Sequence, residues 1–237
     1  MTKRSRRGRL ERIAVRDVSL EVQPAELLAV RGPRRSGRST LLRLAAGMEP
    51  PDEGIVWFEG RDLARVRDEV LGSRLGYCRA SFGSSAADLA VEYAAHGLLA
   101  QHVPPKEATR RAEAMLARVG ADHCASLACY ELSAAERVRV MIASALVSEP
   151  VLLVIDEPTN GVDLLERDPL LALLRSVANE GVAVLMSAGD AQGLSGVDRS
   201  VSLDNGELRG AVVPLGQVVP LKPSEAAADV GSRTQRL

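Results

Sequence analysis

The chain has 237 residues, enough for one large domain or for a core with a subdomain. Hydrophobic residues make up 46%, which suffices for a packed core, and the formal net charge of −1 gives no electrostatic reason to expect a nucleic-acid partner. No apolar run approaches the roughly 18 residues of a membrane span, and the basic N-terminus lacks the apolar segment of a signal peptide. We therefore expect a cytoplasmic protein.

The N-terminal residues 1–12 are rich in Lys and Arg. We predict a solvated, disordered arm there, and contact with anionic lipid headgroups is the alternative. The loose alternation over 13–22 then predicts a strand, which Pro24 ends. The apolar residues of 25–30 predict a second, buried strand.

A glycine-containing segment joins this buried strand to a predicted helix over 41–46. A strand, a glycine loop and a helix in this order are the context of a phosphate-binding P-loop. Glycines let the backbone curl so that successive N–H groups face a phosphate, and the helix N-terminus adds a partial positive charge. The candidate nucleotide-binding residues are Gly32, Pro33, Arg34, Arg35, Ser36, Gly37, Arg38, Ser39 and Thr40. A chance glycine loop is the alternative.

Position 38 departs from the P-loop motif, which has Lys after its second glycine where this chain has Arg38. Lysine offers a compact point charge, whereas arginine brings a wide planar fork, so the exchange is not conservative in a tight site. No lysine lies between Lys3 and Lys106, so none nearby in the sequence takes over the role. Ser39 stands where the motif has the hydroxyl that binds Mg²⁺.

The remaining elements alternate between strands and helices, which predicts an α/β fold with a mixed sheet core. Strands are predicted at 55–60, 75–78, 151–155, 182–187 and 199–203. Residues 86–150 have a helical period and no strand pattern, so they predict an inserted helical subdomain. The α/β core then comprises 13–85 and 151–210, and residues 211–237 form a C-terminal tail.

Two helices carry clear signals within this plan. Ser133 with Glu136 three residues later predicts an N-cap and capping box at the start of a helix that runs to Leu146. A further helix is predicted from Leu164 to Asn179. The apolar strand at 151–155 leads directly into Asp156 and Glu157, and ligands bind at the carboxyl ends of such strands.

The chain has three cysteines, Cys78, Cys124 and Cys129, and no Cys-x-x-Cys pair. His123 beside Cys124, with Cys129 near, is one conceivable set of metal ligands. Buried, inert thiols are the interpretation that we favour, because no second pair of ligands is visible.

Several stretches together resemble one family, the ATP-binding subunits of ABC transporters, and its lipoprotein-release and macrolide-export type in particular. The stretch Leu132, Ser133, Ala134, Ala135 and Glu136 stands where that family has its Leu-Ser-Gly-Gly-Gln signature. Residues 151–157 resemble its Walker B strand, 158–163 its D-loop with Asp163, and 204–206 its last turn. The resemblance covers roughly residues 13–208 and implies a P-loop NTPase fold of ABC type.

The resemblance also implies roles for these residues. Asp156 with Ser39 would hold Mg²⁺, and Glu157 would act as the general base on the attacking water. Each ATP would lie between the P-loop of one subunit and the signature of a second subunit packed head to tail. Transmembrane permease subunits are the further partners implied, which would place the chain on the inner face of the cell membrane.

The chain also departs from the family pattern at several positions. The Q-loop glutamine is expected at Ala80 and the switch histidine at Gly189, and the signature glycines are Ala134 and Ala135. The first aromatic residue is Trp57, so no aromatic precedes the first strand to stack on adenine. Removing one preorganised charge stabiliser commonly costs about a hundred- to a thousandfold in rate. We therefore expect a degenerate cassette that binds ATP with little turnover.

Two other functions stay open on the sequence. One is a working ATPase that energises transport with Arg38 in place of lysine. The other is a DNA-repair or ribosome-associated cassette without a transporter, but such proteins need a long coiled-coil insertion or a tandem cassette, and this chain has neither.

Overall fold

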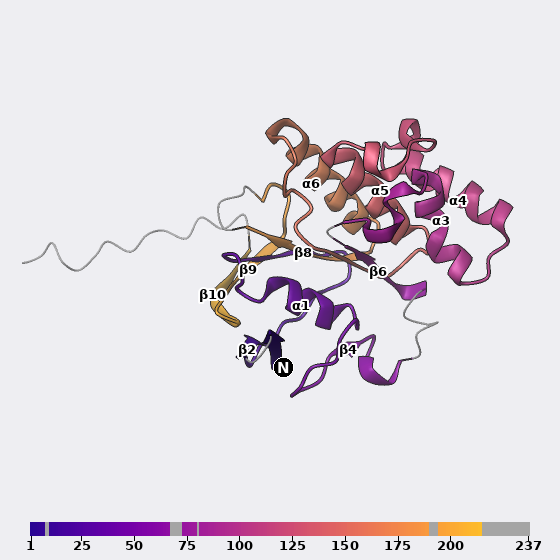
Figure 1. The fold of residues 1–237 in the computed structure, drawn as a ribbon. Coiled ribbons are helices and arrows are strands. Elements are labelled where there is room, and N and C mark those ends of the chain that lie inside the picture. Colours follow the sequence, from indigo (N-terminus) through magenta and orange to yellow (C-terminus); the bar gives the residue numbers. More distant parts are fainter. Residues whose placement is uncertain (8–9, 67–72, 80, 190–193, 215–237) are drawn as a thin grey trace, which may run out of the picture.

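The structure is a computed structural model that describes all residues except 8–9, 67–72, 80, 190–193 and 215–237. Its centre is a twisted sheet between two layers of helix (Figure 1). Within the described residues this sheet has six strands in the order β10-β9-β3-β8-β7-β6. They are β10 (Glu207–Pro214), β9 (Arg199–Asp204), β3 (Leu27–Arg31), β8 (Ala183–Ala188), β7 (Leu152–Ile155) and β6 (Leu75–Cys78). All neighbours are parallel except β9 and β10, so the predicted mixed α/β sheet is confirmed.

The two faces of the sheet bury different side chains of the same strand. On β3, Leu27 and Ala29 pack into the cluster shared with the large helical layer, whereas Leu28 and Val30 pack into the cluster around α1 (Arg38–Ala45). This alternation follows from the two-residue period of a strand. Because both faces are covered, β3 reads in the sequence as a continuous apolar run.

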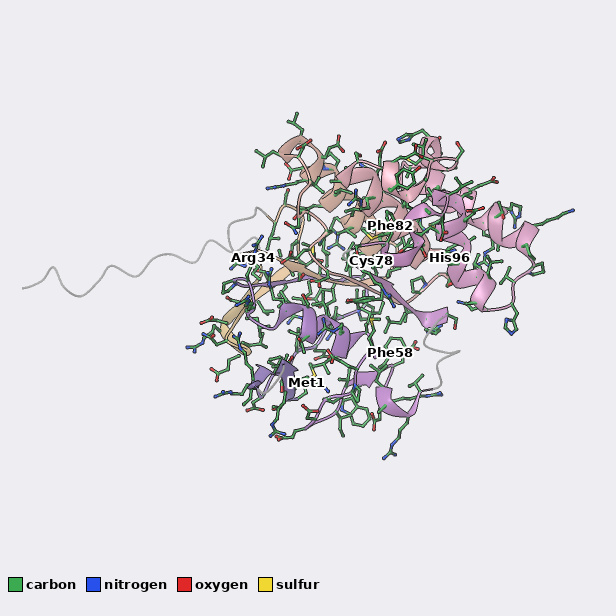
Figure 2. The ribbon with its side chains drawn as sticks, in the orientation of Figure 1. Met1, Arg34, Phe58, Cys78, Phe82 and His96 are labelled. Carbon is green, nitrogen blue, oxygen red and sulfur yellow. The ribbon has the colours of Figure 1, made fainter. Side chains whose placement is uncertain are left out.

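The large helical layer contains α3 (Ala90–Ala100), α4 (Pro105–Arg118), α5 (Ala134–Leu146) and α6 (Leu164–Asn179). Figure 1 shows these helices on the opposite side of the sheet from α1. The labelled side chains in Figure 2 follow the same division, with Met1 and Phe58 on the α1 side and Phe82 and His96 toward the helical layer. No helix among the described residues has the length and apolar character needed to cross a lipid bilayer.

The predicted starts and ends of several elements are confirmed, and others are corrected. The strand at 75–78 and the helix at 164–179 have the predicted bounds, and Ser133 is the N-cap of α5. Within the predicted helical subdomain, helix α4 begins at Pro105, because proline fits the first helical position, where its missing N–H has no intrahelical partner. The strand expected at 55–60 is reduced to β4 (Trp57–Phe58), paired with β5 (Arg61–Asp62).

The prediction of a disordered arm over residues 1–12 is wrong. Lys3–Arg7 forms β1, which pairs antiparallel with β2 (Leu10–Val15). The high charge of the segment gave no strand signal, but contacts with a distant turn position it. Lys3 Nζ donates to the carbonyl of Pro50 at 2.6 Å, and the backbone N–H of Arg4 donates to Asp52 at 2.6 Å. The expected tail at 211 is also corrected, since β10 continues to Pro214.

The loop between β3 and α1 packs against the edge of β2 at Gly37. The backbone there has φ +108, and a Cβ at this position would lie 2.0 Å from the carbonyl oxygen of Ala14. Such a contact requires the backbone to shift. The β1–β2 hairpin and the loop between β3 and α1 therefore pack this closely because Gly37 has no side chain.

The substitution Gly37→Ala should destabilise the fold by more than backbone strain alone. Gly181 is the matched control, because it has φ +104 and a Cβ added there would meet no atom within 4 Å. We expect Gly181→Ala to cost about 1–2 kcal/mol of unfolding free energy and Gly37→Ala to cost about 2 kcal/mol more, from the added collision. Urea unfolding followed by circular dichroism measures both. Equal losses would show that Gly37 does not pack against Ala14 as described.

Candidate functional site

The loop Gly32–Gly37 lies at the carboxyl end of β3, where the sequence predicts a phosphate-binding turn. A Cβ on Gly32 would lie 2.1 Å from the carbonyl oxygen of Leu203, so this position accepts no side chain. Arg35 adopts φ +67, a left-handed conformation that glycine adopts without strain. The loop therefore has the curled backbone of a P-loop, although it reaches that shape with an arginine.

Ser36 lies inside this loop with 3% of its surface exposed. Its backbone N–H donates to the carbonyl of Pro33 at 3.2 Å, whereas its Oγ has no hydrogen-bond partner among the described residues. A buried hydroxyl without a partner is costly, and a bound phosphate oxygen would satisfy it. The glycines and this hydroxyl together make the loop fit a nucleotide's phosphate chain.

The side chain of Arg38 is 6% exposed and contacts the ends of two strands. Its Nη1 donates to the carbonyl oxygen of Ala188, and its Nη2 donates to Oε1 of Glu157 at 2.6 Å. The residue expected to hold phosphate thus forms an ion pair with the residue expected to act as the base. Sequence reasoning did not foresee this contact, since the two residues are 119 positions apart.

The strand order explains why arginine makes both contacts. Arg38 follows β3, Ala188 ends β8, and Glu157 follows β7, while β8 lies between β3 and β7 in the sheet. Neighbouring strands are about 4.8 Å apart, so the side chain must cross the end of one strand to reach the next but one. The guanidinium fork of arginine donates to both acceptors from two different nitrogens, whereas lysine has one ammonium nitrogen on a shorter stem.

Ser187 organises the acidic end of β7 and was not singled out in the sequence. Its Oγ donates to Oδ1 of Asp156 at 2.5 Å and accepts the backbone N–H of Glu157 at 2.9 Å. The side chain is fully buried at the end of an otherwise apolar strand. A lone serine in such a strand was the available signal, because a buried hydroxyl needs partners.

The carboxyl edge of the sheet, near Glu157, has an uncommon backbone conformation and a shifted pKa. Glu157 adopts φ +49, an uncommon conformation for a residue with a side chain. Burial, and after it the negative charge of Asp156, raises the pKa of Tyr77 on the neighbouring strand β6, so the phenol stays neutral. Ser39 follows Arg38 and Asp156 precedes Glu157, so the Arg38–Glu157 pair brings both predicted Mg²⁺ ligands to the same edge of the sheet.

The predicted signature residues gather around a second feature, a pocket of about 470 Å³. Its lining includes Asp163 of the predicted D-loop and the N-terminal turn of α5, with Ser133, Ala134, Ala135 and Glu136. The capping box predicted there is confirmed, with Ser133 N–H donating to Glu136 Oε2 at 2.8 Å and Glu136 N–H donating to Ser133 Oγ at 3.3 Å. Leu132 lies just before this turn and is buried.

The remaining positions at which the sequence departs from the family pattern are the Q-loop, the switch position and the aromatic residue expected to stack on adenine. Ala80, the expected Q-loop position, falls outside the described residues. Gly189, the expected switch position, follows directly on Ala188, whose carbonyl accepts from Arg38. Trp57 lies on β4 with 64% of its surface exposed.

The comparisons with known proteins agree with this architecture. The structure of the ATP-binding cassette MJ0796 in a dimeric post-hydrolysis state with ADP and Pi superposes with a TM-score of 0.80 at 24% identity, over 90% of this chain and 96% of that one. A nucleotide-free ATP-binding cassette from an ABC transporter gives 0.78 at 21% identity, over 90% of each chain. The cassette cbiO1 from Clostridium perfringens, part of the ABC transporter complex cbiONQ, gives 0.73 at 23%, over 84% and 81%.

These likenesses establish the fold, and a family model adds the sequence relationship. The model described as ABC transporter matches residues 15–160, more than half of the chain, and the match includes the P-loop segment, the signature segment and Asp156 with Glu157. The protein therefore belongs to the ABC transporter family, as an ATP-binding cassette.

Proposed function

We propose that this cassette is a degenerate subunit of an ABC transporter, which binds ATP and turns it over slowly or not at all. The observation that carries the proposal is the ion pair between Arg38 and Glu157. It engages the P-loop cation and the candidate base at once, so neither is free for the nucleotide. On the sequence motifs alone we extend the proposal to the lipoprotein-release and macrolide-export type.

Nucleotide binding rests on the loop and on the acidic strand end. The loop amides and the Ser36 hydroxyl would bind phosphate oxygens, while Ser39 and Asp156 would hold Mg²⁺. The metal, when bound, offsets the negative charge of the phosphates. The bond from Ser187 orients Asp156 for this task, in the way that second-shell partners orient metal ligands.

Slow hydrolysis is expected because Glu157 accepts a hydrogen bond from Arg38. A general base needs an oxygen aimed at the attacking water, and here Oε1 accepts a charged guanidinium hydrogen bond, which leaves only Oε2 for that role. Charge-assisted bonds are roughly twice as strong as neutral ones, so the carboxylate is held in place by Arg38. The absence of a glutamine at position 80 and of a histidine at position 189 removes further charge stabilisers.

The proposed partners are a second cassette and membrane permease subunits. MJ0796 is described as a dimer and cbiO1 as part of a transporter complex, which supports both kinds of partner for this chain. In a head-to-tail pair, the pocket at Ser133 and Asp163 would face the partner's nucleotide. We accordingly place the chain on the cytoplasmic face of the membrane, bound to its permease.

A fully active ATPase is the second candidate, because Asp156 and Glu157 are both present at the end of β7. This candidate requires that nucleotide binding breaks the Arg38–Glu157 pair and frees the carboxylate. The two candidates therefore differ in the rate of hydrolysis rather than in the fold.

The first prediction from this proposal concerns MgATP turnover by the purified full chain. We expect a rate below about 1 s⁻¹, a low rate for a normal enzyme. Because Glu157 is already engaged, Glu157→Gln should change the measured phosphate release little. A rate of about 1 s⁻¹ or more that Glu157→Gln abolishes would establish the active ATPase instead.

A second prediction concerns MgATP affinity in the Arg38→Lys variant. Lysine has a shorter stem and lacks the fork with which Arg38 bonds to Ala188 and Glu157, so we expect its ammonium to be available to phosphate. We expect the affinity to rise about five- to tenfold, which corresponds to a coupling of about 1–1.4 kcal/mol. Arg61→Lys is the control, since Arg61 is an exposed arginine on β5, outside the loop, and it should change the affinity less than about twofold.

Isothermal titration calorimetry at a fixed Mg²⁺ concentration measures both variants. An unchanged or weaker affinity of Arg38→Lys, with the control unchanged, would mean that the ion pair does not oppose nucleotide binding.

A further inference from the structure

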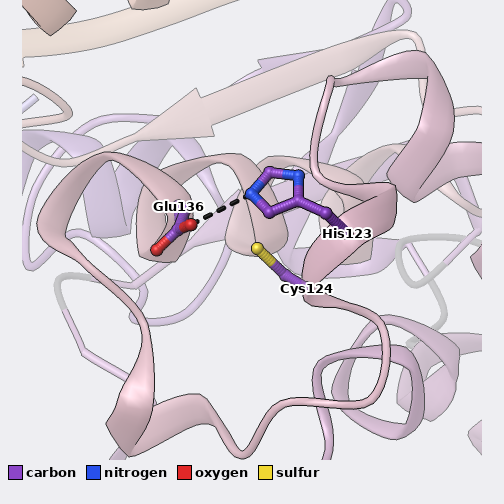
Figure 3. Close-up of side chains that lie close together, drawn as sticks. All are labelled: His123, Cys124 and Glu136. Carbon is purple, nitrogen blue, oxygen red and sulfur yellow. Dashed lines mark hydrogen bonds and ion pairs between the residues drawn. The ribbon is translucent and has the colours of Figure 1, made fainter.

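A cluster of three different metal-binding side chains lies beside the signature pocket. A short 3₁₀ turn at Asp122–Cys124 packs against the first turn of α5, and it places His123 and Cys124 next to Glu136 (Figure 3). The ligand atoms of these three residues lie within 4.8 Å of one another, and His123 Nε2 is 3.0 Å from Glu136 Oε1. The three side chains come from two elements and converge on one point.

We propose that His123 Nε2, Cys124 Sγ and Glu136 Oε1 bind a divalent cation of the zinc class. An imidazole, a thiolate and a carboxylate are the three ligand types of zinc sites, and the presence of sulfur disfavours Mg²⁺ and Ca²⁺. Zinc takes four ligands in a tetrahedron, so three protein ligands leave one position open. The pocket of about 470 Å³ is lined by His123 and Glu136, so it offers that position to water or to a ligand.

The carboxylate of Glu136 has an oxygen to spare for this role. Oε2 accepts the backbone N–H of Ser133 and keeps the capping box of α5, while Oε1 faces His123. Hydrogen bonds from Ser133, and after them the one from His123, lower the pKa of Glu136 to about 2, so the group is a carboxylate at neutral pH. A metal ion can therefore replace the His123–Glu136 contact without unmaking the start of the helix.

Cys124 has to lose its proton when the cluster binds the ion. Burial, and after it the charge of Glu136, raises the pKa of Cys124 to about 11, so the free group is a thiol. On binding, the sulfur–hydrogen bond breaks, a metal–sulfur bond forms, and the proton passes to solvent. The thiolate and the carboxylate then balance the charge of the ion, and no electron is transferred.

The surroundings supply further charges of both signs. Asp163 and Glu166 at the start of α6 line the same pocket and attract a cation. Arg139 also lines it, but its Nη1 donates to the carbonyl of Val119 at 2.7 Å. A bound ion would link the 3₁₀ turn to the signature turn, so metal occupancy would stiffen the surface that the proposal above assigns to the partner.

Titration of the metal-free full chain with Co²⁺ tests this assignment, because a cobalt–thiolate bond gives a charge-transfer absorption band. We expect one ion per chain with this band, and competition by Zn²⁺ that removes it. His123→Gln should weaken binding by about 100-fold, and Cys124→Ser should abolish the band.

Two matched controls separate this cluster from adventitious binding. Cys129→Ser replaces another fully buried thiol, and His102→Gln replaces another exposed histidine, and both should leave the titration unchanged. Since His123 has 59% of its side chain exposed, His123→Gln remains informative even if Cys124→Ser fails to fold. A titration without the charge-transfer band, or one that His123→Gln leaves unchanged, would overturn the assignment and leave only an ion pair that caps the helix.

Discussion

The ion pair between Arg38 and Glu157 is the interaction on which the account of this cassette depends. It crosses the end of β8 and joins the start of α1 to the residue that follows β7. Removing one partner of such a pair leaves a charge without compensation, so a ligand that breaks the contact has to supply a new partner for each of the two groups. In the degenerate subunit proposed above, the same bond that joins the start of α1 to the end of β7 would oppose ATP hydrolysis.

The sequence predicted the sheet, the P-loop and the signature turn, because each has a local signal. The strand β7 is a continuous apolar run that ends in two carboxylates, and α5 begins at a capping box. The strand β1 was missed because its residues are mostly charged, and contacts such as that of Arg4 with Asp52 specify it from 48 positions away. Of the strand predicted at 13–22, only residues 13–15 belong to a strand, β2. The roles of Arg38 and Ser187 were missed for a related reason, since both depend on the strand order β3-β8-β7, which no local pattern reveals.

The two halves of the candidate site differ from the family motifs that they resemble in different ways. In the P-loop, Arg38 stands where the motif has lysine, and its guanidinium donates to the carbonyl of Ala188 and to Glu157. In the signature segment, Ser133 and Glu136 form the capping box that begins α5. This segment has Ala134 and Ala135 where the family signature has two glycines, so it carries two extra methyl groups. A partner with an intact P-loop would therefore meet a well-formed helix start whose surface approaches less closely than two glycines allow.

A double-mutant cycle on the nucleotide-free protein tests the central ion pair most directly. The variants are Arg38→Met, Glu157→Gln and the two together, and urea unfolding measures each free energy. We predict a coupling of about 1–2 kcal/mol, below that of a fully buried pair because the Glu157 side chain is 33% exposed. Additive losses, with no coupling between the two positions, would show that the two side chains do not hold each other and would contradict the account.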